Sequence, residues 1–380
     1  MQKKLIALAI AGLMSAPAFA QSNVTLYGTI DYGFVSLGKS DYENSHDGSK
    51  YKTRNGIESG VSKANRIGFK GVEDLGNGMK AVFVLETGLE GDVPGMFKDN
   101  NRQSYAGFAG NFGTVAFGRQ YTPQHLFTSA VDPFGKNGLG SAGNVLVQDR
   151  RLDNLAAYIS PNFSGFSFIV GYTFNGFGDE NLENNKDTRV WAIAPSFTWN
   201  KLFVGGNYHN ARVMRDKDSG AKSVSALNVW DLYASYDFGI VKLGSTIGRR
   251  TTKKAVISGF DPKDSKITQW MIGATFKLTP NDSILASYSR ASENKVYDSY
   301  NRDDGRPRIS QWAIGYEHAL SKRTVLYSQF STISRNNTWK DTRQFAGLIT
   351  DGPVGSVGDS NLRTYGDYRR GFTVGFRHDF

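Results

Sequence analysis

The sequence predicts an all-β protein, a transmembrane antiparallel β-barrel of 16 strands. Segments with apolar and polar residues in strict alternation recur along the chain, and short turns alternate with long polar connections. The 380 residues include 43 glycines and 13% aromatic residues, but only 39% are hydrophobic, and the mean hydropathy is -0.40. This composition is poor for a large soluble core, whereas it suits a barrel with an apolar outer face and a wet interior.

The N-terminus has the pattern of an export signal. Lys3 and Lys4 precede a short apolar run, and an A-x-A cleavage site ends at Ala20. The run is too short to span a membrane as a helix, and no other stretch approaches the roughly 18 apolar residues that a helix needs. We therefore expect residues 1–20 to be a signal peptide and 21–380 to form one barrel.

The last strand-like segment predicts how the barrel closes. Phe372, Val374 and Phe376 share one face, and Arg377 lies on the other. The edge strand of a soluble sandwich could show the same pattern, but an exposed aromatic edge invites aggregation. A closed barrel has no edge, so we expect this segment to pair with residues 24–34.

The spacing of the connections predicts the number of strands. Seven short connections carry the Gly, Asn, Asp or Pro of tight turns, at 73–78, 110–113, 161–165, 200–201, 237–239, 279–282 and 319–322. Eight long connections are polar, at 39–60, 91–100, 122–148, 176–187, 213–223, 253–266, 291–308 and 336–368. This alternation defines 16 strands, with short turns facing the periplasm. A barrel of that size encloses water.

The connection at 122–148 differs from the others because it is rich in apolar residues. These are Leu126, Phe127, Val131, Phe134, Leu139, Val145, Leu146 and Val147. A loop folded into the barrel and packed on its inner wall would bury them and narrow the lumen. Contact with a neighbouring subunit is the alternative.

The charges favour an aqueous lumen over a nucleic-acid partner. The formal net charge is +10, but no basic run resembles a nucleic-acid-binding arm. Arg66 and Glu86 each alternate with apolar neighbours, and so does Arg151, whereas the face of Arg102 is ambiguous. An arginine at the lipid midplane costs about 2–4 kcal/mol, so these charges should face water. They could be ordinary solvated residues or could select ions.

No pattern indicates an enzyme, a metal or a cofactor. The chain has no cysteine, and its five histidines lack metal-ligand spacing. Residues 138–143 match G-x-G-x-x-G, but no βαβ unit surrounds them. No G-x-S-x-G nucleophile motif occurs.

A set of short motifs occurs in order along the mature chain: Leu26-Tyr27-Gly28, Asn65 to Gly71, Glu73 to Gly78, Leu85 to Gly88, Gly110 to Gly113, Phe117 to Gln120, Tyr158 to Phe163 and the terminal Phe380. Together they resemble the general porins of β-proteobacteria, the neisserial and Burkholderiales-type trimeric family. The resemblance implies an outer-membrane homotrimer of 16-stranded barrels, with the third long loop inside each pore. It also implies passive diffusion of small hydrophilic solutes and ions, often with a preference for anions.

The resemblance also implies residue roles. Arg66, Arg102 and Arg151 match wall arginines that face the third loop in anion-selective relatives. Beyond the resemblance, we take Glu86 and Asp132 as candidate counter-charges, which would split the field across the constriction.

Three positions depart from the family pattern. Val84, Leu155 and Ala157 stand where family members often carry polar residues. The constriction is therefore expected to be less polar than usual.

The expected surroundings follow from the same resemblance. They are outer-membrane lipid and lipopolysaccharide, and the barrel-assembly machinery, which would read Phe380. Two alternatives remain: a substrate-specific channel for sugars or carboxylates, and an adhesion or structural barrel whose long loops carry the function.

Overall fold

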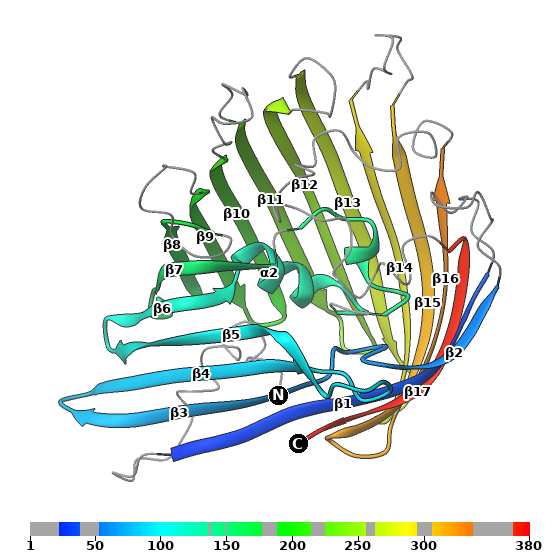
Figure 1. Cartoon of the computed structure of the whole chain (residues 1–380), viewed down its shortest axis with the longest axis horizontal. Helices are drawn as coiled ribbons and strands as arrows, with labels where there is room; N and C mark the ends of the chain where they lie inside the picture. Colours follow the sequence, from blue (N-terminus) through cyan, green and yellow to red (C-terminus); the bar gives the residue numbers. More distant parts are fainter. Residues whose placement is uncertain are drawn as a thin grey trace.

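The computed structural model describes residues 23–38, 53–135, 138–148, 150–176, 188–213, 225–255, 263–294, 306–336 and 368–380. The expected signal peptide lies outside them. The described strands form one antiparallel sheet in which strands adjacent in sequence pair, except that β2 and β3 both pair with β1, and β1 pairs with β17 to close the barrel (Figure 1).

The structure has 17 strand segments but 16 barrel strands, as predicted. β2 and β3 both pair with β1, so together they form one interrupted barrel strand. The segments are β1 (Asn23–Leu37), β2 (Arg54–Ser59), β3 (Arg66–Gly76), β4 (Met79–Leu89), β5 (Phe97–Gly110), β6 (Gly113–Tyr121), β7 (Arg151–Ile159), β8 (Phe166–Thr173), β9 (Arg189–Trp199), β10 (Leu202–Val213), β11 (Ser225–Asp237), β12 (Val241–Ala255), β13 (Lys263–Lys277), β14 (Asp282–Glu293), β15 (Arg308–Ala319), β16 (Thr324–Arg335) and β17 (Arg370–Asp379).

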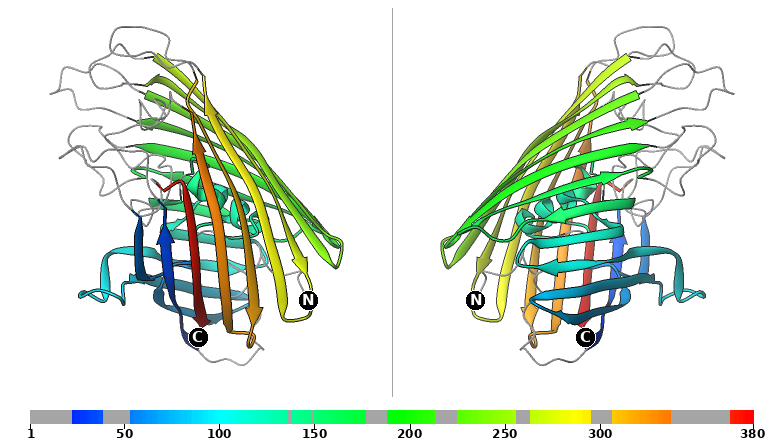
Figure 2. Two further views of the ribbon diagram at one scale, coloured as in Figure 1. Left: turned by 90° about the vertical axis from the view of Figure 1, so that its right-hand side faces the viewer. Right: turned by 90° about the vertical axis from the view of Figure 1, so that its left-hand side faces the viewer.

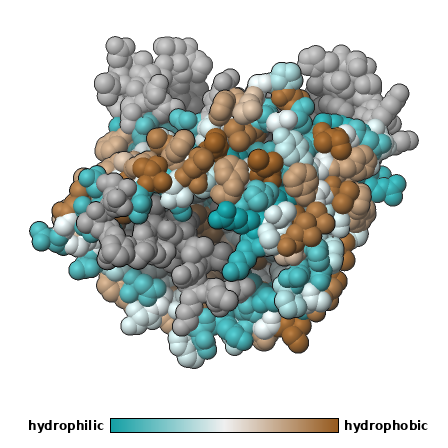
Figure 3. Space-filling view, turned by 90° about the horizontal axis from the view of Figure 1, so that it is seen from below, coloured by the Kyte–Doolittle hydropathy of each residue, from teal (hydrophilic) through white to brown (hydrophobic). Residues whose placement is uncertain are grey.

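The seam between β1 and β17 confirms the prediction made from the last strand. Thr29 pairs with Asp379, and the register runs unbroken to Leu37 and Gly371. On β17, Phe372, Val374 and Phe376 are exposed on the outer face, whereas Thr373 lies between them in sequence and is fully buried on the inner side. Seen from below, brown hydrophobic residues gather along the outer side of the barrel drawn on the right (Figure 3). Outward apolar rows are what a barrel strand needs in lipid.

The break between β2 and β3 turns a short segment into the lumen. Gly60 adopts φ 69, and the Asp31 carboxylate then accepts hydrogen bonds from the backbone N–H groups of Val61, Ser62 and Lys63. The Tyr327 hydroxyl donates to the same carboxylate at 2.6 Å. These bonds replace the ladder bonds that the turned segment gives up.

The connection between β6 and β7 lies inside the barrel, as predicted (Figures 1 and 2). It contains α2 (Pro123–Val131) and a short 3-10 helix, η1 (Ala142–Asn144). Thr122 caps α2 by accepting a hydrogen bond from the backbone N–H of His125, and a proline occupies the first turn. Within the described residues, no helix is long and apolar enough to cross a membrane.

Several strands extend further than the sequence pattern predicts. The connection expected at 39–60 contains β2, and the one expected at 91–100 contains the start of β5 at Phe97. The hydrophobic alternation ends where strands leave the lipid, because polar residues there suit both faces. Backbone pairing between the strands continues beyond that point. The end of the hydrophobic alternation therefore indicates where a strand leaves the membrane, and not where the strand itself ends.

Candidate functional site: the constriction of the lumen

The loop inside the barrel is anchored first through α2. The Phe127 ring is fully buried and packs edge-on against Phe203 and Tyr233, with ring centroids 5.7 and 5.6 Å apart. Gln124 Nε2 donates to Asp231 Oδ2 on β11 at 2.8 Å. Aromatic packing and a buried hydrogen bond thus hold α2 on the wall formed by β10 to β12.

The rest of the loop continues along the same side of the lumen. A Cβ at Gly244 would lie 2.0 Å from the carbonyl oxygen of Val131, so only glycine permits this approach. Phe134 packs with Leu285 and Ala313. Ser331 Oγ donates to the Leu139 carbonyl at 2.7 Å. The loop therefore covers the wall from β10 to β16, and it leaves the wall from β3 to β6 without these contacts.

Asp132 does not serve as the predicted counter-charge across the constriction. Its carboxylate is buried and accepts hydrogen bonds from the backbone N–H groups of Phe134 at 3.0 Å and Ala142 at 2.9 Å. Burial raises the pKa of Asp132 to about 7, against the opposing effect of these two bonds. The side chain ties the loop to itself, and sequence spacing alone could not show these backbone partners.

The uncovered wall carries a compact arginine cluster around Glu86. Arg102 Nε donates to Glu86 Oε1 at 2.6 Å, and Arg66 Nε lies 3.8 Å from Glu86 Oε2. The Tyr27 hydroxyl donates to the same carboxylate at 3.1 Å. Arg102 Nη2 also donates to the hydroxyl oxygen of Tyr121 at 2.7 Å. Glu86 is only 6% exposed, so its negative charge interacts with groups of the wall and not with solutes in the lumen.

Glu86 was also predicted to face the arginines across the lumen, and here the structure differs again. β3, β4 and β5 are hydrogen-bonded neighbours, so Arg66, Glu86 and Arg102 share one side of the barrel. The alternation in the sequence predicted the inner face for Glu86 correctly, because Glu86 points inward and its neighbour Leu85 is exposed. Pairing between strands, which sequence alternation does not reveal, decides which charges are adjacent.

Tyr121 joins two further arginines to the cluster. Arg151 Cζ lies 4.9 Å from the centre of the Tyr121 ring, and Arg151 Nη2 lies 3.4 Å from its hydroxyl oxygen. Burial, followed by the nearby charge of Arg151, lowers the pKa of Arg150 to about 9, which leaves it protonated at neutral pH. The prediction missed Arg150, although the adjacent Arg150-Arg151 pair is visible in the sequence.

Two irregularities in the strands set the directions of these side chains. Glu86 pairs with Gln103 and Thr87 pairs with Asn101, so Arg102 is the extra residue of a bulge. The bulge explains why the face of Arg102 was ambiguous in the sequence. A second irregularity separates the Gly118 and Gln120 pairings of β6, close to Asn154, which has φ 50.

Two guanidinium groups, those of Arg66 and Arg102, thus pair with one carboxylate, and Arg150 and Arg151 add positive charge beside Tyr121, so the cluster has an excess of positive charge. No group of three or more His, Cys, Asp or Glu residues suited to a metal occurs among the residues that the structure describes. Val84, Leu155 and Ala157 point inward and are buried. The lumen therefore has a charged region beside an apolar one.

The fold and this lining define an outer-membrane channel, with a lipid-facing barrel, an aqueous lumen and a loop that narrows it. A family model described as Gram-negative porin matches residues 7–338. The chain belongs to the Gram-negative porin family, and it forms a passive channel in the outer membrane of a Gram-negative bacterium.

Individual relatives agree with this assignment. The chain is 28% identical over 398 residues to outer membrane porin protein 32 of Delftia acidovorans, which covers 100% of both chains. It is 30% identical over 272 residues to an outer membrane porin protein of Bordetella pertussis, across 66% of this chain and 70% of the other. The solved structure of an anion-selective porin from Comamonas acidovorans has a TM-score of 0.71 at 23% identity, and the match covers 95% of this chain and 100% of that one. This structural likeness concerns the fold.

Proposed function

We propose that this porin prefers small anions and that the arginine cluster causes the preference. The observation that carries the proposal is the excess of guanidinium groups, Arg66, Arg102, Arg150 and Arg151, over the single carboxylate of Glu86. Among the described residues of the loop between β6 and β7, the one acidic residue is Asp132, whose carboxylate accepts hydrogen bonds from backbone N–H groups. Asp132 therefore does not offset the positive charge of the open wall.

The mechanism is diffusion through a local electrostatic field. A unit charge about 4 Å from a guanidinium interacts by about 4 kcal/mol at an effective dielectric of 20, and by about 1 kcal/mol in bulk water. At physiological ionic strength, charges further than about 8 Å apart are largely screened. The cluster thus attracts anions and repels cations mainly inside the constriction, so the total charge of the protein matters little there.

The Glu86 carboxylate tempers this attraction and fixes the arginines. It accepts a hydrogen bond from Arg102 and lies near Arg66, which holds both guanidinium groups against the wall. An anion then finds nitrogen donors along the wall without a closed binding cage. Weak, repeated contacts of this kind suit conduction, because an ion must leave the site as readily as it enters.

The remaining parts of the proposal rest on the sequence resemblance. The mature protein begins at Gln21 and forms a homotrimer surrounded by outer-membrane lipid and lipopolysaccharide. The terminal Phe380 is read by the barrel-assembly machinery. The channel passes small hydrophilic solutes and inorganic ions without catalysing a reaction.

The test uses the purified protein in a planar lipid bilayer. We expect stable steps of conductance and, in a gradient of KCl, a zero-current potential whose sign shows that chloride is more permeant than potassium. A potential with the opposite sign would contradict the anion preference. An absence of stable conductance would instead favour an adhesion or structural barrel.

A further inference from the structure

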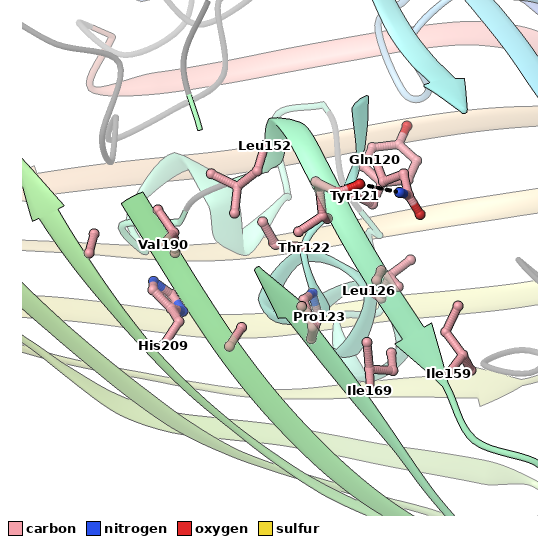
Figure 4. A pocket seen from close by; sticks show the side chains of 15 residues that line it. Gln120, Tyr121, Thr122, Pro123, Leu126, Leu152, Ile159, Ile169, Val190 and His209 are labelled. Atoms are coloured by element: carbon pink, nitrogen blue, oxygen red, sulfur yellow. Dashed lines mark hydrogen bonds between the residues drawn. The ribbon is translucent and has the colours of Figure 1, made fainter. Parts of the chain in front are cut away.

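An apolar pocket lies between the first turn of α2 and the inner wall formed by β7 to β10 (Figure 4). Its volume is about 40 Å³. Leu152, Leu155 and Val190 line the wall side, and Leu126 lines the helix side. These wall residues belong to inward-facing rows, so the pocket borders the lumen and not the lipid.

The polar side chains at the rim of the pocket are engaged within the protein. Gln120 Nε2 lies within hydrogen-bonding distance of backbone carbonyl oxygens, including that of Leu155 at 3.3 Å. Thr122 Oγ1 accepts from the His125 backbone, and His209 Nδ1 lies 3.3 Å from Asn207 Oδ1. The pocket therefore offers a solute mainly apolar contacts.

Tyr121 connects this pocket to the arginine cluster. Tyr121 lines the pocket, and its hydroxyl oxygen lies 2.7 Å from Arg102 Nη2 and 3.4 Å from Arg151 Nη2. In the pairing of β6 with β7, Arg151 lies opposite Tyr121 and the pocket-lining Leu152 lies opposite Gln120, so the pocket and the cluster meet at consecutive pairs of the same two strands. A molecule with a negative end and an apolar end could thus place one on the guanidiniums and the other beside Leu152.

We propose that this pocket and the arginine cluster together form a binding site for short-chain alkyl monocarboxylates in transit. The proposal deepens the proposed function and rests on it, since the arginines hold the carboxylate. The size of the pocket decides the length of the tail. A cavity of about 150 Å³ accommodates benzene, so a pocket of about a quarter of that volume accepts an ethyl-sized group but no aromatic ring. Butyrate is the expected size.

The experiment measures block of chloride current by two anions of equal charge and similar length, butyrate and 3-hydroxypropionate. The second replaces the terminal methyl of the first by a hydroxyl group. Because each buried methylene strengthens binding about fourfold, butyrate should block at a concentration at least about fourfold lower. The wild-type protein is used, together with the Val190→Thr variant, which puts a hydroxyl group into the pocket at nearly constant volume.

Val84→Thr is the matched control, because Val84 also points inward but does not line the pocket. We expect Val190→Thr to bring the two anions close to equal block and Val84→Thr to keep the difference. Ala192→Ser, a second pocket variant, serves if Val190→Thr fails to assemble.

Three results would overturn the inference. If both anions blocked the wild-type channel equally and the chloride preference were intact, the pocket would not be a binding site, whereas the proposed function would still hold. A difference that survives in both pocket variants would place the apolar contact elsewhere. Loss of the chloride preference itself would refute the proposed function and this inference with it.

Discussion

The two sides of the lumen share the alternation of inward and outward residues, but their inward residues differ in character. On β3 to β5 the inward positions hold charges that are paired within the wall, as between Arg102 and Glu86. On β7 to β12 many inward positions are apolar, and α2 packs against part of this wall through Phe127. Inward-facing residues of a wide barrel are therefore not uniformly polar. Their character depends on whether water or a folded loop lies against them.

The largest expected effect comes from removing the one carboxylate of the charged wall. Glu86→Gln leaves Arg66 and Arg102 without their shared partner, and breaking a buried pair in this way costs about 3 kcal/mol of folding free energy or more. The same variant should strengthen the chloride preference. Thermal unfolding followed by circular dichroism and the zero-current potential measure the two effects.

Glu58→Gln is the control for that variant, since Glu58 pairs with an exposed Arg54 and such pairs contribute at most about 1 kcal/mol. If Glu86→Gln were no less stable than Glu58→Gln, the charged wall would not depend on its carboxylate.

The covered wall is best tested at Phe127. Phe127→Ala removes a fully buried ring between Phe203 and Tyr233, which should weaken anchoring of the loop by about 3 kcal/mol. We expect larger current fluctuations in single-channel records, because α2 is held less firmly. Phe117→Ala, on the outer face of β6, should leave the current steady. Equal noise in both variants would argue against packing as the anchor of the loop.

The loop should also respond to pH through Asp132. The pKa of this carboxyl is raised by burial from 3.8 to about 7, so the folded loop binds a proton more tightly than the unfolded loop does. The contribution to stability is fully present below pH 3.8 and is lost as pH rises toward about 7. Current fluctuations should therefore increase between about pH 5 and 7. Asp132→Asn should abolish this dependence, and an unchanged pH profile in the variant would refute the assignment.

The smallest effect is expected where charges already cancel outside the cluster. Arg119 pairs with Asp153, so removing both in Arg119→Gln/Asp153→Asn leaves the net charge unchanged. The zero-current potential should match that of the wild type. A clear shift would mean that the field at the constriction extends beyond the cluster around Glu86.

Sequence periodicity could predict the barrel, because lipid imposes alternation on each strand and turn residues mark the short connections. It also placed Arg66 and Glu86 on the inner face correctly. It could not predict contacts that depend on interruptions of the ladder. The bulge at Arg102 and the break after Gly60 are examples, since each changes direction without a strong sequence signal. The backbone partners of Asp132 likewise depend on how the loop folds.

The most direct test of the central claim is the zero-current potential in a KCl gradient for Arg66→Gln/Arg102→Gln/Arg151→Gln. The matched variant neutralises Arg189, Arg212 and Arg249, which are exposed on the outer face of the barrel, and so removes the same total charge. We expect the lumen variant to lose most of its chloride preference and the outer-face variant to retain it. An unchanged potential in the lumen variant, or an equal change in both, would contradict the account.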